Sequence, residues 1–157
     1  MNFFENAKIG EKLDFIGPSG RFTAPKMPQD ELLMAGTGFR RGIAPHIAIL
    51  YQLENTNPDQ KITLYFGLRG EKDIFVKGIL DNFKTILSNF DYHICLSKPS
   101  TSWNGMRGRI TELFGIKNPK SMNAFICGNN FMVEEASGLL VTKGVLQKDI
   151  FHEKFTL

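Results

Sequence analysis

Residues 31–54 read ELLMAGTGFRRGIAPHIAILYQLE and contain, in this order, a short apolar run, a glycine-rich turn and a longer amphipathic run. The apolar run Glu31–Gly36 is short and nearly continuous, which is typical of a strand whose two faces are both buried. The run Ile43–Glu54 predicts a helix, because Pro45 falls in its first turn, where a missing N–H costs nothing. A strand, a turn and a helix in succession form one unit of an α/β sheet.

The same unit recurs along the rest of the chain. Further strands are predicted at Ile62–Gly67, Tyr92–Ser97, Met122–Gly128 and Ile150–Phe155. Further helices are predicted at Asp73–Asn89 with Asp73 as N-cap, near Ile110–Phe114, and at Phe131–Lys143 with a stop at Gly144. We therefore predict the α/β class, with a five-stranded parallel sheet in a three-layer sandwich. The run Ala7–Phe22 does not follow this alternation of strands and helices. It predicts a strand between two turns, which would be the end of another structural unit.

Composition excludes several classes of protein. The 157 residues are 42% apolar and 22% charged, which suits one globular domain. A net charge of +3 without a basic run gives no support for nucleic-acid binding. No stretch approaches the about 20 apolar residues of a membrane span, so we expect no membrane partner and a cytoplasmic location. Cys95 and Cys127 form no Cys-x-x-Cys motif, so no zinc or iron–sulfur site is expected, and both read as buried thiols.

Glycines and polar residues follow four of the predicted strands. Ligands of parallel sheets bind at the carboxyl ends of strands, where glycines admit a close backbone approach and helix N-termini offer N–H groups to phosphates. The residues at these ends are Gly36-Thr37-Gly38, Gly67-Leu68-Arg69, Ser97-Lys98-Pro99 and Cys127-Gly128. A dinucleotide is the ligand class that suits them, although a glycine-rich turn can also be only a tight turn. The spacing G-x-G-x-x-x-G differs from the common dinucleotide fingerprint, which argues against an ordinary Rossmann dehydrogenase.

Charge is also unevenly placed along the chain. The only charged residues between Leu32 and Leu53 are Arg40 and Arg41. Between Tyr92 and Thr111 they are Lys98, Arg107 and Arg109. These two acid-free stretches could face one anionic ligand, or they could be ordinary solvated surface.

Six motifs together resemble the ferredoxin–NADP reductase superfamily, in the order of that family and over nearly the whole chain. They are Gly17-Pro18-Ser19-Gly20-Arg21-Phe22; Ala35-Gly36-Thr37-Gly38 with Ile43-Ala44-Pro45; Tyr65-Phe66-Gly67-Leu68-Arg69 with Asp73; Leu96-Ser97 with Trp103-Asn104-Gly105 and Gly108; Cys127-Gly128 with Met132-Val133; and Glu153-Lys154-Phe155. The resemblance implies a ferredoxin-reductase-like nucleotide-binding fold with strand order 3-2-1-4-5, preceded by a flavin-binding β-barrel. Residues 1–25 would be the remnant of that barrel and residues 26–157 the NAD(P)-binding domain.

The resemblance also implies roles for individual residues. Cofactor-binding roles fall on Gly36, Thr37, Gly38, Gly67, Arg69, Ser97, Lys98, Arg107, Cys127, Gly128 and Phe155. Thr37 and Gly38 would line the path of the pyrophosphate and nicotinamide, whereas Ser97 and Lys98 would approach the adenosine ribose. Cys127 would lie beside the nicotinamide ring and position it rather than act as a nucleophile. Glu153 and Phe155 would face the flavin, so Cys127 and Glu153 are the candidate catalytic residues.

The segment Phe39–Gly42 departs from the family pattern, in which Gly-Thr-Gly leads directly into Ile-Ala-Pro. We expect the insertion to lengthen the phosphate loop and to let Arg40 or Arg41 contact the pyrophosphate. The alternative is that it blocks or reshapes the site.

The implied activity is that of an NAD(P)H-dependent flavin oxidoreductase, in which hydride passes from the nicotinamide to FAD. FAD would be held mainly by a domain absent from this chain, so the chain alone should be inactive. The electron acceptor would be an iron–sulfur, haem or oxygenase partner protein. Lys98, Arg107 and Arg109 could hold a 2′-phosphate, but the pattern Ser-x-Pro-x-x-x-Trp-x-Gly favours NADH over NADPH. Two alternatives stay open, a regulatory nucleotide-binding module without turnover and an electron-transfer subunit of a larger complex.

Overall fold

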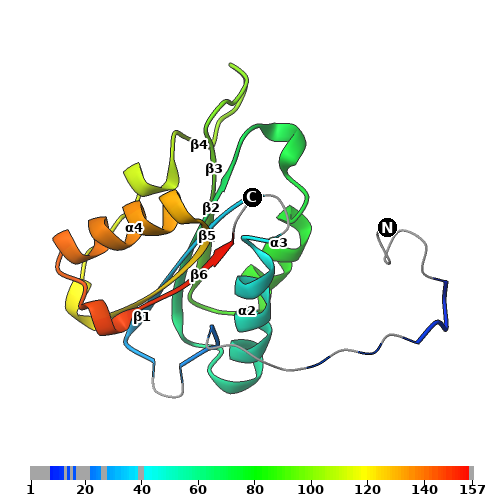
Figure 1. The fold of residues 1–157 in the computed structure, drawn as a ribbon, viewed down its shortest axis with the longest axis horizontal. Coiled ribbons are helices and arrows are strands. Elements are labelled where there is room, and N and C mark those ends of the chain that lie inside the picture. Colours follow the sequence, from blue (N-terminus) through cyan, green and yellow to red (C-terminus); the bar gives the residue numbers. More distant parts are fainter. Residues whose placement is uncertain are drawn as a thin grey trace.

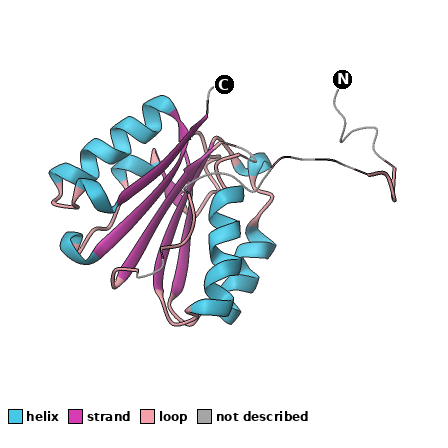
Figure 2. Cartoon of the chain, turned by 60° about the horizontal axis from the view of Figure 1, so that its bottom comes forward, coloured by secondary structure: helices cyan, strands magenta, loops and turns pink. Residues whose placement is uncertain are grey.

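A parallel β-sheet with helices on both faces forms the body of the protein. The computed structural model describes residues 8–12, 14, 16, 22–25, 28–38 and 41–155. The strands are β1 (Glu31–Thr37), β2 (Lys61–Leu68), β3 (Phe90–Leu96), β4 (Met106–Arg107), β5 (Met122–Asn129) and β6 (Ile150–Phe155). The helices are α2 (Ala44–Thr56), α3 (Lys77–Ile86) and α4 (Asn130–Thr142). Figure 2 shows the sheet between α4 on one face and the pair α2 and α3 on the other.

The sheet has six strands in the order β4-β3-β2-β1-β5-β6, and every neighbouring pair is parallel. The prediction of five strands was therefore wrong in number, and the order of the complete sheet differs from 3-2-1-4-5 by one added edge strand. The five predicted strands lie in the order β3-β2-β1-β5-β6, which is the predicted order among themselves. The difference arises from the added strand β4, which has only two residues and pairs with Cys95 and Leu96 at the edge of the sheet. A two-residue strand is too short to show any periodicity, so it was assigned to a loop.

The core divides into two apolar clusters, one on each face of the sheet. Phe66 of β2, Leu50 of α2 and Phe83 of α3 are fully buried in the first cluster. Ala35 of β1 and Val133 of α4 are fully buried in the second. Because neighbouring side chains of a strand point to opposite faces, β1 supplies both clusters, which explains its continuous apolar sequence.

The helix predicted at Asp73–Asn89 begins later and ends earlier than expected, since α3 spans Lys77–Ile86. Asp73 does not cap α3, because its carboxylate accepts a hydrogen bond from the Gly70 N–H at 3.0 Å. It thereby closes a short 3₁₀ turn at Glu71–Asp73, which precedes the helix. The helix predicted near Ile110–Phe114 is likewise only a 3₁₀ turn at Ile110–Glu112.

Helix α4 agrees closely with its prediction. Its N-cap is Asn129, whose side chain accepts a hydrogen bond from the Met132 N–H. The predicted stop at Gly144 is confirmed, because this glycine has φ +100° and its N–H reaches the carbonyl of Val141.

The N-terminal segment runs away from the sheet (Figure 1), and Ile9 and Ile16 are fully exposed. Of residues 7–22, the structure describes 8–12, 14, 16 and 22, which contain no strand, and residues 7, 13, 15 and 17–21 lie outside the described part, so the predicted strand stays a prediction. Among the described residues of this segment, Phe22 is the first that packs on the body, and its ring centroid lies 5.5 Å from that of His46 and 5.4 Å from that of Phe125.

Two features are absent from the described residues. No helix there combines the length and the apolar character needed to cross a membrane. The same residues contain no group of His, Cys, Asp and Glu side chains that could hold a metal ion.

Candidate functional site

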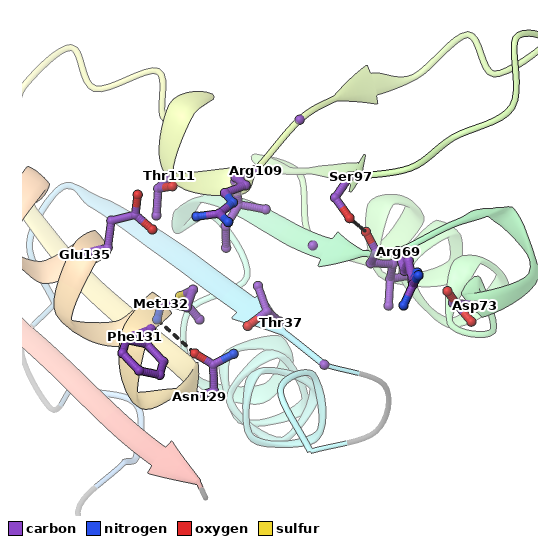
Figure 3. Close-up of a pocket in the computed structure, with 15 residues that line it drawn as sticks. Thr37, Arg69, Asp73, Ser97, Arg109, Thr111, Asn129, Phe131, Met132 and Glu135 are labelled. Carbon is purple, nitrogen blue, oxygen red and sulfur yellow. Dashed lines mark hydrogen bonds between the residues drawn. The ribbon is translucent and has the colours of Figure 1, made fainter. Parts of the chain in front are cut away.

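A cavity of about 810 Å³ opens at the carboxyl edge of the sheet. Its size suits a ligand of drug or cofactor class. Figure 3 shows Arg69, Ser97 and Asp73 on one side and Asn129, Phe131 and Glu135 on the other. The full lining comprises Thr37, Gly38, Gly67, Leu68, Arg69, Asp73, Ser97, Gly108, Arg109, Ile110, Thr111, Asn129, Phe131, Met132 and Glu135.

The structure brings five of the predicted binding residues together around this cavity. They come from the ends of three adjacent strands and are Thr37, Gly38, Gly67, Arg69 and Ser97. This convergence follows from the topology, because the carboxyl ends of parallel strands meet at one edge. The structure therefore unites residues that are up to 60 positions apart in the sequence, Thr37 and Ser97.

Glycines at the strand ends let the floor of the cavity pack tightly. A Cβ at Gly67 would lie 2.9 Å from both Thr37 Cγ2 and Ile110 Cγ2. A Cβ at Gly128 would lie 2.6 Å from Thr37 Oγ1 and would overlap the terminal methyl of Met132. Gly128 itself does not line the cavity. The absence of a side chain at Gly128 leaves room for Thr37 and Met132, which do line it.

The loop after β1 doubles back on itself. A Cβ at Gly36 would overlap the carbonyl oxygen of Gly42, and a Cβ at Gly42 would overlap the backbone of Thr37. Gly38 has φ +87°, a conformation that favours glycine. Arg41 follows on the exposed side of this loop, whereas Phe39 and Arg40 lie outside the described residues.

Two of the predicted cationic residues lie elsewhere. Arg107 does not line the cavity, because its Nη2 donates hydrogen bonds to the carbonyls of Thr101 and Trp103 at 3.1 and 2.5 Å. Lys98 lines a neighbouring hollow of about 420 Å³, which shares Arg69 with the main cavity and also contains Glu71 and Lys72. Arg109 is the second arginine of the main cavity.

Cys127 lies buried at the end of β5, where its Sγ donates to the carbonyl of Arg41 at 3.5 Å. Burial, together with the carboxylate of Glu153, raises the pKa of the Cys127 thiol to about 12. Glu153 is its register partner on β6. The thiol is therefore protonated at neutral pH and cannot serve as a nucleophile. Its hydrogen bond instead ties the loop after β1 to the end of β5.

Phe155 at the end of β6 reaches the same loop. Its ring lies 3.2 Å from the position that a Cβ on Gly38 would take. Cys127, Glu153 and Phe155 do not line the cavity. Cys127 and Phe155 contact the loop after β1, and Glu153 is next to Cys127 in the sheet.

Two hydroxyl groups of the cavity residues have no partner within the described part of the chain. They are Thr37 Oγ1 and Thr111 Oγ1, and each is a buried atom. A buried hydroxyl without a hydrogen bond is costly, so these atoms are candidates to bind ligand or water. Together with the glycine floor and two arginines, they give the cavity donors and acceptors that fit a phosphate- and ribose-bearing ligand.

His46 packs against the end of β1, next to the loop that follows this strand. Its Nε2 lies 3.2 Å from the carbonyl oxygen of Ala35, and burial lowers the pKa of the imidazole to about 4. The neutral ring donates this hydrogen bond and packs near Gly36. It does not line the cavity, so its role is structural.

Sequence reasoning missed the wall that α4 supplies. Asn129, Phe131 and Glu135 line the cavity, but none of them was a candidate. A signal was present, since Phe131 and Glu135 are spaced i, i+4 and lie off the core stripe formed by Met132, Val133, Ala136 and Leu140. Asp73 and Thr111 also line the cavity, although Asp73 was predicted only as a motif residue and N-cap and Thr111 only as part of a helix.

A sequence model of the oxidoreductase NAD-binding domain family matches residues 32–138. The chain belongs to this family. Among curated relatives, the NAD-binding domain is 27% identical over 154 residues to the toluate 1,2-dioxygenase electron transfer component of Pseudomonas putida, covering 95% of this chain and 44% of that protein. It is 29% identical over 157 residues to a subunit of the Na(+)-translocating NADH-quinone reductase of Psychrobacter arcticus, covering 94% and 38%. The chain thus spans less than half the length of these relatives.

Solved structures share the fold of this NAD-binding domain. The FAD/NAD-binding domain of nitric oxide dioxygenase from Vibrio cholerae superposes with a TM-score of 0.83 at 18% identity, over 98% of this chain and 62% of that one. The Amycolatopsis cytochrome P450 reductase GcoB superposes with a TM-score of 0.81 at 24% identity, over 90% and 43%. At these identities the superpositions establish the fold alone.

Proposed function

We propose that this NAD-binding domain presents NADH or NADPH to FAD in a flavin-dependent oxidoreductase. The observation that carries the proposal is the cavity at the carboxyl edge of the sheet, where Thr37, Gly67 and Arg69 converge in a domain of the NAD-binding family. When bound, NAD(P)H supplies the hydride that reduces the flavin. The protein contributes binding, orientation and exclusion of water.

The dinucleotide would lie across the cavity from Arg69 to α4. Arg69 and Ser97 suit the phosphates and the adenosine ribose, while Thr37 and Gly38 let the pyrophosphate approach the backbone. Gly36 would act indirectly, because its missing side chain leaves room for the Gly42 carbonyl in the same loop. Lys98 is next to this end of the cavity, in the hollow that shares Arg69. Arg41 is on the loop beside the pyrophosphate path, which keeps the proposed contact of Arg40 or Arg41 as a prediction.

The flavin would approach at the end of β6. Phe155 lies against Gly38, and Glu153 is next to Cys127 in the sheet. We propose that Cys127 and Gly128 shape the nicotinamide end while Glu153 and Phe155 face the flavin. A protonated, hydrogen-bonded Cys127 fits a positioning role. Residues 1–25 would lead to a flavin-binding barrel, and residues 26–157 would be the nucleotide-binding domain.

The names of the relatives support the kind of electron acceptor. Toluate 1,2-dioxygenase electron transfer component and propane 2-monooxygenase, reductase component, from Rhodococcus jostii, are both parts of oxygenase systems. We propose a partner of this kind for the present chain, an oxygenase, iron–sulfur or haem protein that takes electrons from the flavin.

NADH is the preferred nucleotide in this proposal. The hollow beside Lys98 also contains Glu71, whose carboxylate accepts hydrogen bonds from the Ser100 N–H at 2.8 Å and the Ser100 hydroxyl at 2.5 Å. These bonds lower the pKa of Glu71, so it is ionised at neutral pH. A fixed carboxylate suits the hydroxyls of a ribose. Arg69, Lys72 and Lys98 line the same hollow and would attract a 2′-phosphate, so the preference for NADH rests on Glu71 together with the sequence pattern from Ser97 to Gly105.

The first test is a calorimetric titration of the chain with NADH and NADPH in parallel. The chain should bind NADH more tightly than NADPH. Arg69→Ala should weaken NADH binding about tenfold, because an arginine–phosphate hydrogen bond is lost. Lys143→Ala, at the end of α4 away from the cavity, serves as the matched charge control and should bind like the wild type. Equal affinities of Arg69→Ala and wild type would remove the phosphate role of this side chain, and absence of binding by the wild type would remove the proposal itself.

A further inference from the structure

The side chain of Phe131 is unusual among the apolar residues of the sheet body. It lies in the first turn of α4 and lines the cavity, yet 87% of it is exposed. Other large apolar residues of this helix, such as Met132 and Leu140, are buried. The ring therefore contributes little to the core, and its area stays in contact with water.

Two residues of α4 one turn apart, Phe131 and Glu135, form a face that is separate from the core stripe of the helix. Both line the cavity, and Figure 3 shows them on its α4 side, opposite Arg69 and Ser97. The backbone beneath the ring is fixed, because the Asn129 side chain accepts a hydrogen bond from the Met132 N–H at 3.0 Å. A helix start held in this way places the phenyl ring at a defined position on the rim.

Charge decides which part of a dinucleotide belongs at this rim. Glu135 adds a carboxylate to the α4 wall, so this wall is less favourable for phosphates, whereas Arg69 on the opposite side and Arg109 attract them. The α4 wall thus suits an uncharged planar ring. The position of Asn129, the N-cap of α4, indicates that this ring is the nicotinamide. Asn129 is the register partner of Phe155 on β6, at the end where the flavin would approach.

We propose that Phe131 stacks on one face of the reduced nicotinamide and is a specificity-determining residue of this site. The inference rests on the proposed function and deepens it. The phenyl ring covers one face of the nicotinamide, removes both rings from water and leaves the other face open toward the flavin. The adenosine half of the ligand, held near Arg69, makes no contact with it.

The test compares two ligands that differ in the nicotinamide ring. Wild type, Phe131→Ala and Phe131→Tyr are each titrated with NADH and with ADP-ribose, which lacks the nicotinamide. Phe131→Ala should raise the Kd for NADH about fivefold to tenfold, as the loss of one aromatic contact predicts. The Kd for ADP-ribose should stay within about twofold, and Phe131→Tyr should restore NADH binding. The fluorescence change of the bound reduced nicotinamide should shrink in Phe131→Ala and return in Phe131→Tyr.

Val141→Ala is the matched control, since it removes an exposed apolar side chain from the same helix away from the cavity. An unchanged Kd for NADH in Phe131→Ala would overturn the proposal. An equal loss for NADH and ADP-ribose would also overturn it, because it would indicate a general distortion of the site. Failure of the wild type to bind either ligand would instead overturn the proposed function, so the two failures are distinguishable.

Discussion

His46 is a neutral, fully buried imidazole beneath the loop after β1. Burial removes the ring from water, and the hydrogen bond to the Ala35 carbonyl only partly offsets this effect on the pKa. Single residues of this kind are hard to interpret from sequence, because a histidine in a helix gives no indication of how deeply it is buried. The same limit applies to Arg107, whose charge indicated a ligand but whose guanidinium holds the carbonyls of Thr101 and Trp103.

His46 should make the stability of the chain depend on pH. The pKa is about 4 in the folded state and 6.5 in the reference state, so the unfolded chain binds the extra proton between these values. The free energy of unfolding should therefore fall by about 3 kcal/mol from this residue as the pH drops from 6.5 to about 4. Urea unfolding across this range measures the effect. His46→Gln keeps a donor for Ala35 and should lose this part of the slope, whereas His152→Gln, on the exposed part of β6, should keep it. A His46→Gln slope equal to that of the wild type would contradict the assignment.

At the scale of elements, strands and helices with a regular apolar pattern were predictable, whereas very short elements and the bounds of α3 were not. The run Glu31–Gly36 predicted β1 because its apolar residues are buried on both faces. The bounds of α3 were not predictable, since Asp73 bonds to Gly70 in a preceding turn rather than to the helix. Likewise β4 exists only through its pairing with β3, and such pairing is not encoded in two residues. Of the site, sequence reasoning gave the strand ends, but not the wall formed by α4.

The junction of β5 and α4 depends on Gly128. Gly128→Ala places a Cβ against Met132 and 2.6 Å from Thr37 Oγ1, so one of these side chains must move. We expect the free energy of unfolding to fall by about 1–3 kcal/mol, as for other overpacked cores. Gly138→Ala is the matched control within α4, because its Cβ meets nothing within 4 Å. It should stabilise the helix by up to about 1 kcal/mol. Urea denaturation measures the change in the free energy of unfolding for both variants. A Gly128→Ala protein as stable as the wild type would refute the packing argument.

The whole molecule consists of a sheet body and an N-terminal segment that leaves it (Figure 1). The first contact of this segment with the core is made by Phe22, against His46 and Phe125. The described residues before Phe22 are exposed, and Ile9 and Ile16 are fully exposed. Apolar side chains that stay in water add nothing to the stability of the sheet body.

Removal of residues 1–16 should therefore leave the stability of the body unchanged to within about 0.5 kcal/mol. Phe22→Ala in the full chain should lower it by about 2 kcal/mol, because a partly buried ring is lost from the contact with Phe125. Urea unfolding compares the two variants. NADH titration of the shortened chain should give the wild-type Kd, since none of the described residues before Thr37 lines the cavity. If the shortened chain were as unstable as Phe22→Ala, residues 1–16 would be part of the folded body. The folded body would then begin at the first residue whose burial stabilises it.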